Sequence, residues 1–103
     1  MASPVDIEPL ASAVVDTHCH MDFAFDDEHQ LTSVKNALAN AAAVGVSHVI
    51  QVGCDVESSR NAVEIATQYD NVWATVAIHP NDAVRDQNLE ASLATINELA
   101  QLD

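Results

Sequence analysis

The sequence predicts an α/β protein with a parallel sheet in the order βαβαβα. Three short β-forming segments begin near residues 13, 46 and 72, and each is followed by a longer segment with apolar residues at helical spacing. Strands that alternate with helices of about a dozen residues require parallel pairing and right-handed crossovers. The carboxyl ends of the three strands therefore meet at one rim of the sheet.

The N-terminal residues 1–12 contain two prolines and little periodicity, so we expect a loose leader outside the fold. The folded domain is expected to span residues 13–103. Its first strand, Ala13 to Thr17, leads directly into two histidines. Because side chains alternate along a strand, His18 and His20 are predicted to point to one side and Cys19 to the other.

Two imidazoles one strand step apart can converge on one metal ion, and they follow a strand, where α/β proteins place their sites. His18 and His20 are therefore candidate metal ligands. The alternative is that each is an ordinary hydrogen-bonded histidine, because short motifs often match by chance. The acidic loop Phe23 to His29 comes next, and His29 is expected to be solvated rather than a ligand.

The remaining elements follow from apolar periodicity and from residues that favour turns. A helix is predicted from Leu31 to Val44, and Gly45 is placed for a left-handed cap. The other predicted elements are a strand from Val46 to Val52, a helix from Val56 to Tyr69, a strand from Val72 to Ile78 that His79-Pro80 ends, and a helix from Leu89 to Leu102.

The expected rim gathers His18, His20, the turn Gly53 to Asp55, and His79. The two histidines of the first strand and His79 from the third could surround a metal, which would lower the pKa of a bound water and polarise an ester or phosphoryl oxygen. The sequence identifies no general acid or base. Asp22 is the nearest carboxylate, but a loop aspartate is more often a cap or solvated.

Two further polar residues have default structural interpretations. Asp55 stands at the head of a predicted helix, where an N-cap is the default role. His48 lies on a strand below the rim and is most simply a hydrogen-bonded core or interface residue.

The composition limits the classes of partner. Sixteen acidic residues face only three basic ones, for a formal net charge of −13, so a nucleic acid or phosphoester substrate would need bound cations. The alternative is that the acidity serves solubility alone. Cys19 and Cys54 are expected to be free thiols. No membrane span or signal peptide is predicted, and we expect a cytoplasmic protein.

Three motifs together resemble the TatD-like metal-dependent deoxyribonucleases, which are amidohydrolase-type TIM barrels. They are Asp16-Thr17-His18-Cys19-His20-Met21-Asp22, Val52-Gly53-Cys54-Asp55 and Trp73-Ala74-Thr75-Val76-Ala77-Ile78-His79-Pro80, and the resemblance spans Val14 to about Leu99. It implies that the chain forms the first three units of a (β/α)₈ barrel, the N-terminal fragment of a phosphodiester hydrolase that acts as a DNA exonuclease.

The resemblance also implies a site. His18 and His20 would be metal ligands of a two-metal site, and His79 would bind the substrate phosphate. The metal ion, Zn, Mg or Mn, is not distinguished. The family often has a histidine where this chain has Asn81, and its bridging glutamate, two later histidines and late aspartate have no counterpart here. We therefore expect the chain alone to be inactive or nearly so.

Two alternatives stay open at this point. A metal-dependent amide or lactone hydrolase would share these ligands on the same barrel. A chain of 103 residues is also too short to close a barrel of about 250, so a non-catalytic truncated fragment or a small binding domain is the other interpretation. An open sheet edge would further allow the chain to self-associate.

Overall fold

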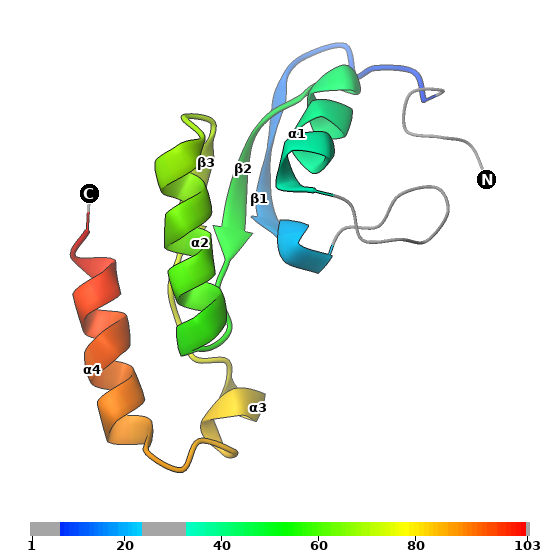
Figure 1. Ribbon diagram of the computed structural model, residues 1–103. Coiled ribbons are helices and arrows are strands. Elements are labelled where there is room, and N and C mark those ends of the chain that lie inside the picture. Colours follow the sequence, from blue (N-terminus) through cyan, green and yellow to red (C-terminus); the bar gives the residue numbers. More distant parts are fainter. Residues whose placement is uncertain (1–6, 24–32, 103) are drawn as a thin grey trace.

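The computed structural model describes residues 7–23 and 33–102 (Figure 1). Three strands, β1 (Val14–Cys19), β2 (Val46–Val52) and β3 (Val72–Thr75), form one parallel sheet in the order β1-β2-β3. They alternate with helices, so the predicted α/β class and the βαβαβα order are confirmed. β1 extends two residues beyond the expected end, and its pairing with β2 is irregular between Asp16 and Cys19.

The three long helices lie where the periodicity placed them. They are α1 (Val34–Ala43), α2 (Val56–Gln68) and α4 (Leu89–Ala100). Two short elements were not predicted, the 3₁₀ turn η2 (Met21–Phe23) and the helix α3 (Pro80–Ala83). A single helical turn contains too few residues to show apolar periodicity, so the pattern carries no signal for either.

Local chemistry explains where the helices begin and end. Ser33 caps α1 by accepting the N–H of Asn36, and Gly45, just beyond that helix, has a φ of 101°. This left-handed conformation suits glycine, as the sequence predicted. At the start of α2, Asp55 and Ser58 form a reciprocal capping box, which confirms the N-cap role expected of Asp55.

The expected end of β3 at Ile78 was wrong, because the strand ends at Thr75. Beyond Thr75 the backbone pairs with the β2–α2 region instead of a strand. The hydroxyl of Ser59 on α2 accepts the N–H of Ala77 at 3.1 Å and donates to its carbonyl at 3.2 Å. The N–H of His79 then donates to the carbonyl of Cys54 at 2.7 Å. The Ser59 side chain thus takes the place of the neighbouring strand with which Ala77 would otherwise pair.

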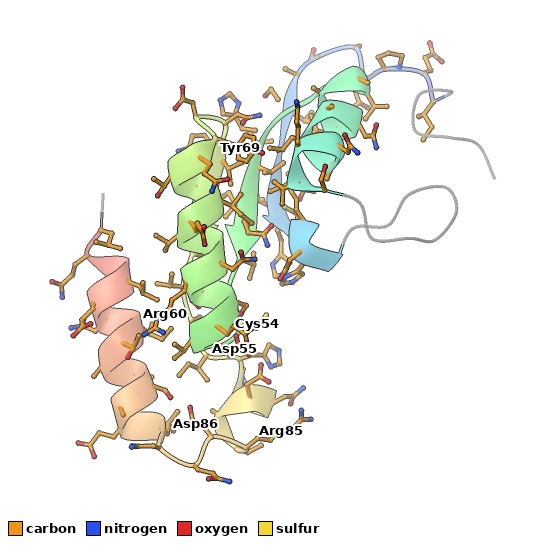
Figure 2. All side chains as sticks on the ribbon, in the orientation of Figure 1. Cys54, Asp55, Arg60, Tyr69, Arg85 and Asp86 are labelled. Carbon is orange, nitrogen blue, oxygen red and sulfur yellow. The ribbon has the colours of Figure 1, made fainter. Side chains whose placement is uncertain are left out.

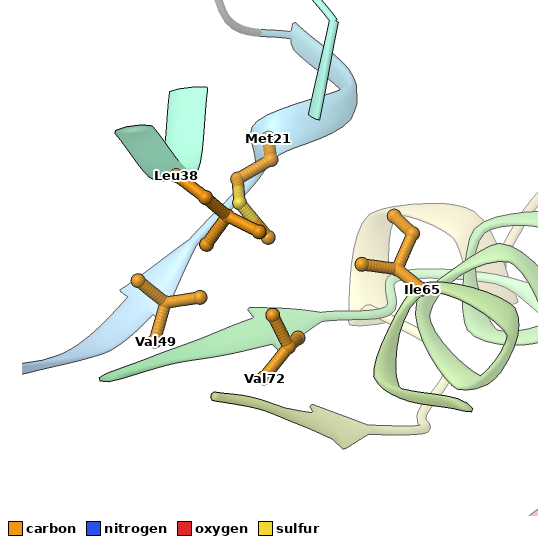
Figure 3. Close-up of a cluster of buried hydrophobic side chains, with 5 residues drawn as sticks. All are labelled: Met21, Leu38, Val49, Ile65 and Val72. Atoms are coloured by element: carbon orange, nitrogen blue, oxygen red, sulfur yellow. The ribbon is translucent and has the colours of Figure 1, made fainter. Parts of the chain in front are cut away.

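The core lies on one face of the sheet, under α1 and α2. Figure 3 shows its five buried side chains, which come from η2, α1, β2, α2 and β3: Met21, Leu38, Val49, Ile65 and Val72. α4 lies beside α2 and away from α1 (Figure 1). On the opposite face Trp73 remains 51% exposed and stacks on His48, with ring centroids 5.1 Å apart. The described part of the sheet is therefore covered on one face only.

Parts of the sequence predictions lie outside the described residues. These are residues 1–6 of the leader, the loop residues 24–29 with His29, and the expected helix start at Leu31. The boundary of the domain at residue 13 stays a prediction. Of the expected leader, residues 7–12 are described, and a backbone hydrogen bond joins them to the rest of the chain: the N–H of Leu10 donates to the carbonyl of Val44 at 2.9 Å.

Candidate functional site

The carboxyl ends of the three strands carry the residues that the sequence placed at one rim. His18 and His20 lie at the end of β1, the turn Gly53 to Asp55 follows β2, and His79 follows β3. Figure 2 shows Cys54 and Asp55 at the N-terminal end of α2, next to α3. Because the His79 N–H donates to Cys54, the second and third strand ends are joined directly.

The His18 and His20 rings lie on the same side of β1, as strand alternation predicts. Their centroids are 5.2 Å apart and their planes meet at 77°, edge to face. His18 is exposed and His20 is half-buried. The backbone N–H of His18 donates to the Asp16 carboxylate at 3.1 Å, which fixes the chain just before the pair.

Cys19 lies on the other side of the strand and packs against the core. Its thiol donates to the carbonyl of Ile50 at 3.4 Å. Burial, reinforced by the carboxylates of Asp16 and Asp22, raises the pKa of the Cys19 thiol to about 11. Because Cys19 faces the core and not the two histidines, it contributes to the packing.

Gln51 lies beside the candidate site, bound to Met21 and Asp22, and the sequence alone did not identify it. It lies on β2, is 1% exposed, and its Nε2 donates to the Asp22 carboxylate at 2.9 Å. Its Oε1 accepts the N–H of Met21 at 2.8 Å. Asp22 is thus bound by a buried amide and is neither a helix cap nor fully solvated. The only sequence signal was a single amide within an apolar strand.

The turn after β2 is organised by Ser58. Its Oγ accepts the N–H groups of Cys54 and Asp55, and it donates to the Asp55 carboxylate at 2.6 Å. The Ser58 hydroxyl, and then its N–H, lower the pKa of Asp55. Asp55 therefore remains an ionised structural cap at neutral pH. Burial is the main cause that raises the pKa of the neighbouring Cys54 thiol, and the negative charges of Asp82, Asp55 and Asp22 add to it.

His79 is exposed, and its ring orientation has a chemical consequence. Its Nδ1 accepts the N–H of Asn81 at 3.1 Å as the N-cap of α3. Because Nδ1 accepts, the hydrogen-bond network assigns the proton of a neutral His79 to Nε2. An Nε2–H group is a donor, which suits an anionic oxygen and not a metal ion.

The structure does not assemble a complete metal centre. Within residues 7–23 and 33–102, no three His, Cys, Asp or Glu side chains lie close enough together to hold a metal ion. Beside the rim, a depression of about 730 Å³ is lined mostly by polar and acidic residues of η2 and α2: Asp22, Asp55, Val56, Glu57, Ser58, Arg60, Asn61 and Glu64. This lining repels phosphates unless cations offset it.

Comparison with known proteins gives a consistent set of matches. A family model described as TatD related DNase matches residues 15–103. Over 85 residues, or 82% of this chain, it is 34% identical to the metal-dependent hydrolase MG009 of Mycoplasma genitalium and 32% identical to YabD of Bacillus subtilis, also named a metal-dependent hydrolase. Over 46 residues it is 39% identical to the 3'-5' ssDNA/RNA exonuclease TatD of Cronobacter sakazakii, covering 45% of this chain.

These relatives are much longer than the region that matches. The aligned part covers 30% of MG009, 31% of YabD and 18% of the Cronobacter exonuclease. In the described part of the chain, no helix is both long and apolar enough to cross a membrane.

Proposed function

Because this chain belongs to the TatD-related DNase family, we propose that the protein to which it contributes is a cytoplasmic, metal-dependent hydrolase of phosphodiester bonds that trims nucleic acid from an end. The family match over residues 15–103 and the relatives named as metal-dependent hydrolases and as ssDNA/RNA exonucleases support this proposal. The three parallel strands are consistent with the N-terminal units of a (β/α)₈ barrel.

His18 and His20 are proposed to hold a divalent ion, of a kind that their chemistry does not fix. The observation that carries this role is the 5.2 Å separation of their ring centroids on one side of β1. Two imidazoles bound at about 2.0–2.1 Å to one tetrahedral zinc place their ring centres roughly 5 Å apart, so the pair fits two of the ligand positions. When bound, such an ion supplies an activated water near neutral pH.

His79 is proposed to contact the substrate phosphate through its Nε2–H. The N–H of Asn81 occupies Nδ1, which leaves the ring a hydrogen-bond donor at its other nitrogen. Asn81 itself stands where the family often has a second histidine, so the phosphate contact rests on His79 alone.

The chain on its own is proposed to be inactive or nearly so. Catalytic metal sites use three protein ligands or more, whereas the described residues bring only His18 and His20 together and hold no group of three candidate ligands. A purified 103-residue chain should therefore release no nucleotides from labelled single-stranded DNA with Mg²⁺, Mn²⁺ or Zn²⁺. Turnover at a rate typical of enzymes would contradict this part of the proposal.

The experiment for the function itself replaces each proposed ligand in the complete protein. His18→Ala and His20→Ala should each lower the release of nucleotides from end-labelled DNA by orders of magnitude while circular dichroism shows a retained fold. The matched control is His48→Ala, because His48 lies below the rim and stacks on Trp73. Unchanged hydrolysis in either the His18→Ala or the His20→Ala variant would contradict the proposed function.

A non-catalytic binding domain is the second candidate, and one observation favours it. The described residues hold no group of three potential metal ligands. If this candidate is right, the chain should run as a compact monomer on size exclusion and melt cooperatively without metal. A metal-dependent amide or lactone hydrolase is separated from the nuclease by substrate profiling of the complete protein.

A further inference from the structure

We propose that Gln51 is a positioning residue for the candidate metal ligands, because its buried amide holds Met21 and Asp22, the two residues that follow His20. The metal-binding role of His18 and His20 rests on the proposed function. The hydrogen bonds of Gln51 stand independently of that role.

The first observation is that the Gln51 amide binds the two residues after His20 and lies beside the Cys19 thiol before it. Its Oε1 accepts the N–H of Met21 at 2.8 Å, and the thiol of Cys19 lies 3.8 Å from the same oxygen. Its Nε2 donates to the carboxylate of Asp22 at 2.9 Å. One side chain on β2 therefore holds Met21 and Asp22 by hydrogen bonds.

The second observation is that the orientation of this amide is forced. A backbone N–H can only donate, so the atom facing Met21 must be the oxygen. A carboxylate can only accept, so the atom facing Asp22 must be the nitrogen. Gln51 is 1% exposed and its bond to Met21 is buried, so water does not compete for that bond, whereas Asp22 is half-buried. The amide is therefore locked in one arrangement.

The third observation is that the strand ladder alone leaves this region weakly fixed. Pairing between β1 and β2 is irregular between Asp16 and Cys19, and His18 lies within that interval. The ladder skips His18 and resumes only at Cys19, which pairs with Gln51 at the last position of β1. The side-chain bonds of Gln51 continue from this last ladder pair to Met21 and Asp22, and they set the position from which the His20 imidazole projects.

The test compares three changes in the 103-residue chain by NMR. Gln51→Met keeps the length of the side chain and removes both bonds. Gln51→Glu keeps an acceptor for the Met21 N–H but sets two carboxylates against each other. The double variant Gln51→Glu with Asp22→Asn restores the side-chain bond with donor and acceptor exchanged. Gln68→Met and Gln68→Glu, on the exposed end of α2, are the matched controls.

Two readouts are measured, the exchange rate of the Met21 amide proton and the dissociation constant for Zn²⁺ from a titration. Residues that orient metal ligands typically change metal affinity by about 10–100-fold when replaced. Gln51→Met and Gln51→Glu should weaken zinc binding within that range, and Gln51→Met should also speed Met21 exchange. The swapped pair should recover most of the zinc affinity, and the controls should match the unmodified chain.

Several results would overturn the proposal. One is a folded Gln51→Met variant that binds zinc as the unmodified chain does, and another is a swapped pair as weak as Gln51→Glu alone. A chain that binds no zinc would also overturn it. Val49 amide exchange reports whether each variant is folded. Because neither readout uses hydrolysis, a complete protein without nuclease activity would remove the proposed function and leave this result intact.

Discussion

At the scale of single residues, the carboxylate of Asp55 lies at the rim but stabilises the start of a helix. Asp55 lies in the turn after β2, beside Cys54, yet its oxygen accepts the N–H of Ser58 at 2.7 Å as the cap of α2. Its pKa is lowered by the Ser58 hydroxyl and N–H. Asp55 therefore links stability to pH without taking part in a reaction.

Replacing Asp55 tests this link. Asp55→Ala should cost about 1 kcal/mol of unfolding free energy at pH 7, the usual loss for an N-cap. Because the folded state lowers the carboxyl pKa, the unfolded chain binds more protons near its ordinary value of 3.8. The stabilisation is therefore fully present above that value and is lost as the pH falls from it through the lower pKa of the folded state. Urea denaturation from pH 7 to pH 3 measures the difference.

Asp55→Asn is the control, because asparagine also caps helices but does not titrate. It should lose less than Asp55→Ala at pH 7 and should remove the part of the acid sensitivity that Asp55 contributes. An Asp55→Ala penalty that is constant from pH 7 to pH 3 would show that the ionised carboxylate is not what stabilises the cap.

The sequence predicted single residues where one local rule decides the outcome. Strand alternation put His18 and His20 on one side and Cys19 on the other, and the head of a helix identified Asp55 as a cap. The partner of Asp22 was not predictable in this way. Gln51 lies 29 residues further along the chain, and only the parallel pairing of β1 with β2 brings its amide to the turn. The roles of the histidines in metal and substrate binding stay predictions.

At the scale of elements, the junction between α2 and the end of β3 is held by one hydroxyl. Ser59 has no exposed surface, and it is bonded to both backbone groups of Ala77. Gly53 allows this close approach, since a Cβ there would lie 2.7 Å from the Ser59 Cα and 2.9 Å from the Thr75 carbonyl oxygen. The segment that leads to His79 therefore depends on α2.

Ser59→Ala should loosen this segment. The change removes the partner of the N–H and carbonyl of Ala77, which costs about 0.5–1.5 kcal/mol for a typical hydrogen bond, because Ala77 is exposed and water can replace part of the loss. The expected result is a lower urea midpoint together with faster exchange of the Ala77 amide proton. Thr67→Ala is the control, because that exposed hydroxyl bonds only to Val63 within the same helix. Equal losses in the two variants would contradict the argument.

The bounds of the three elements around this junction could be predicted only in part. β2 was predicted with its observed bounds and α2 to within one residue, because long apolar periodicity determines both. β3 was predicted three residues too long, since Val76 and Ile78 have high strand propensity. Their backbone lies beyond the end of β2, and propensity does not report whether a partner strand is present.

At the scale of the whole molecule, the described sheet has two edges and one open face. β1 and β3 each pair with β2 alone, and the radius of gyration is 15.3 Å, against roughly 13 Å for a compact domain of about 100 residues. Large apolar side chains on the edge strands remain exposed: Val14 at 40%, Val15 at 43% and Trp73 at 51%. The alternation of strands and helices predicted this sheet, but it did not predict which surfaces stay uncovered.

We expect the 103-residue chain to self-associate through these edges, in a way that depends on salt. Unpaired strand edges template pairing with another chain, whereas a net charge of −13 makes the copies repel. Salt screens the repulsion over a distance that falls from about 30 Å at 0.01 M to about 3 Å at 1 M ionic strength. Association measured by sedimentation velocity should therefore strengthen as salt is added.

Two substitutions locate the surface responsible for this association. Val15→Lys places a charge on an edge strand and should weaken association by about tenfold or more, equal to about 1.4 kcal/mol. Leu93→Lys, on α4 and 51% exposed, should leave it unchanged. Trp73 is the only tryptophan, so its fluorescence should shift to shorter wavelength as the β3 edge becomes covered. A monomer at every salt and protein concentration would mean that the edges are protected, and it would favour an independent binding domain over an open part of a barrel.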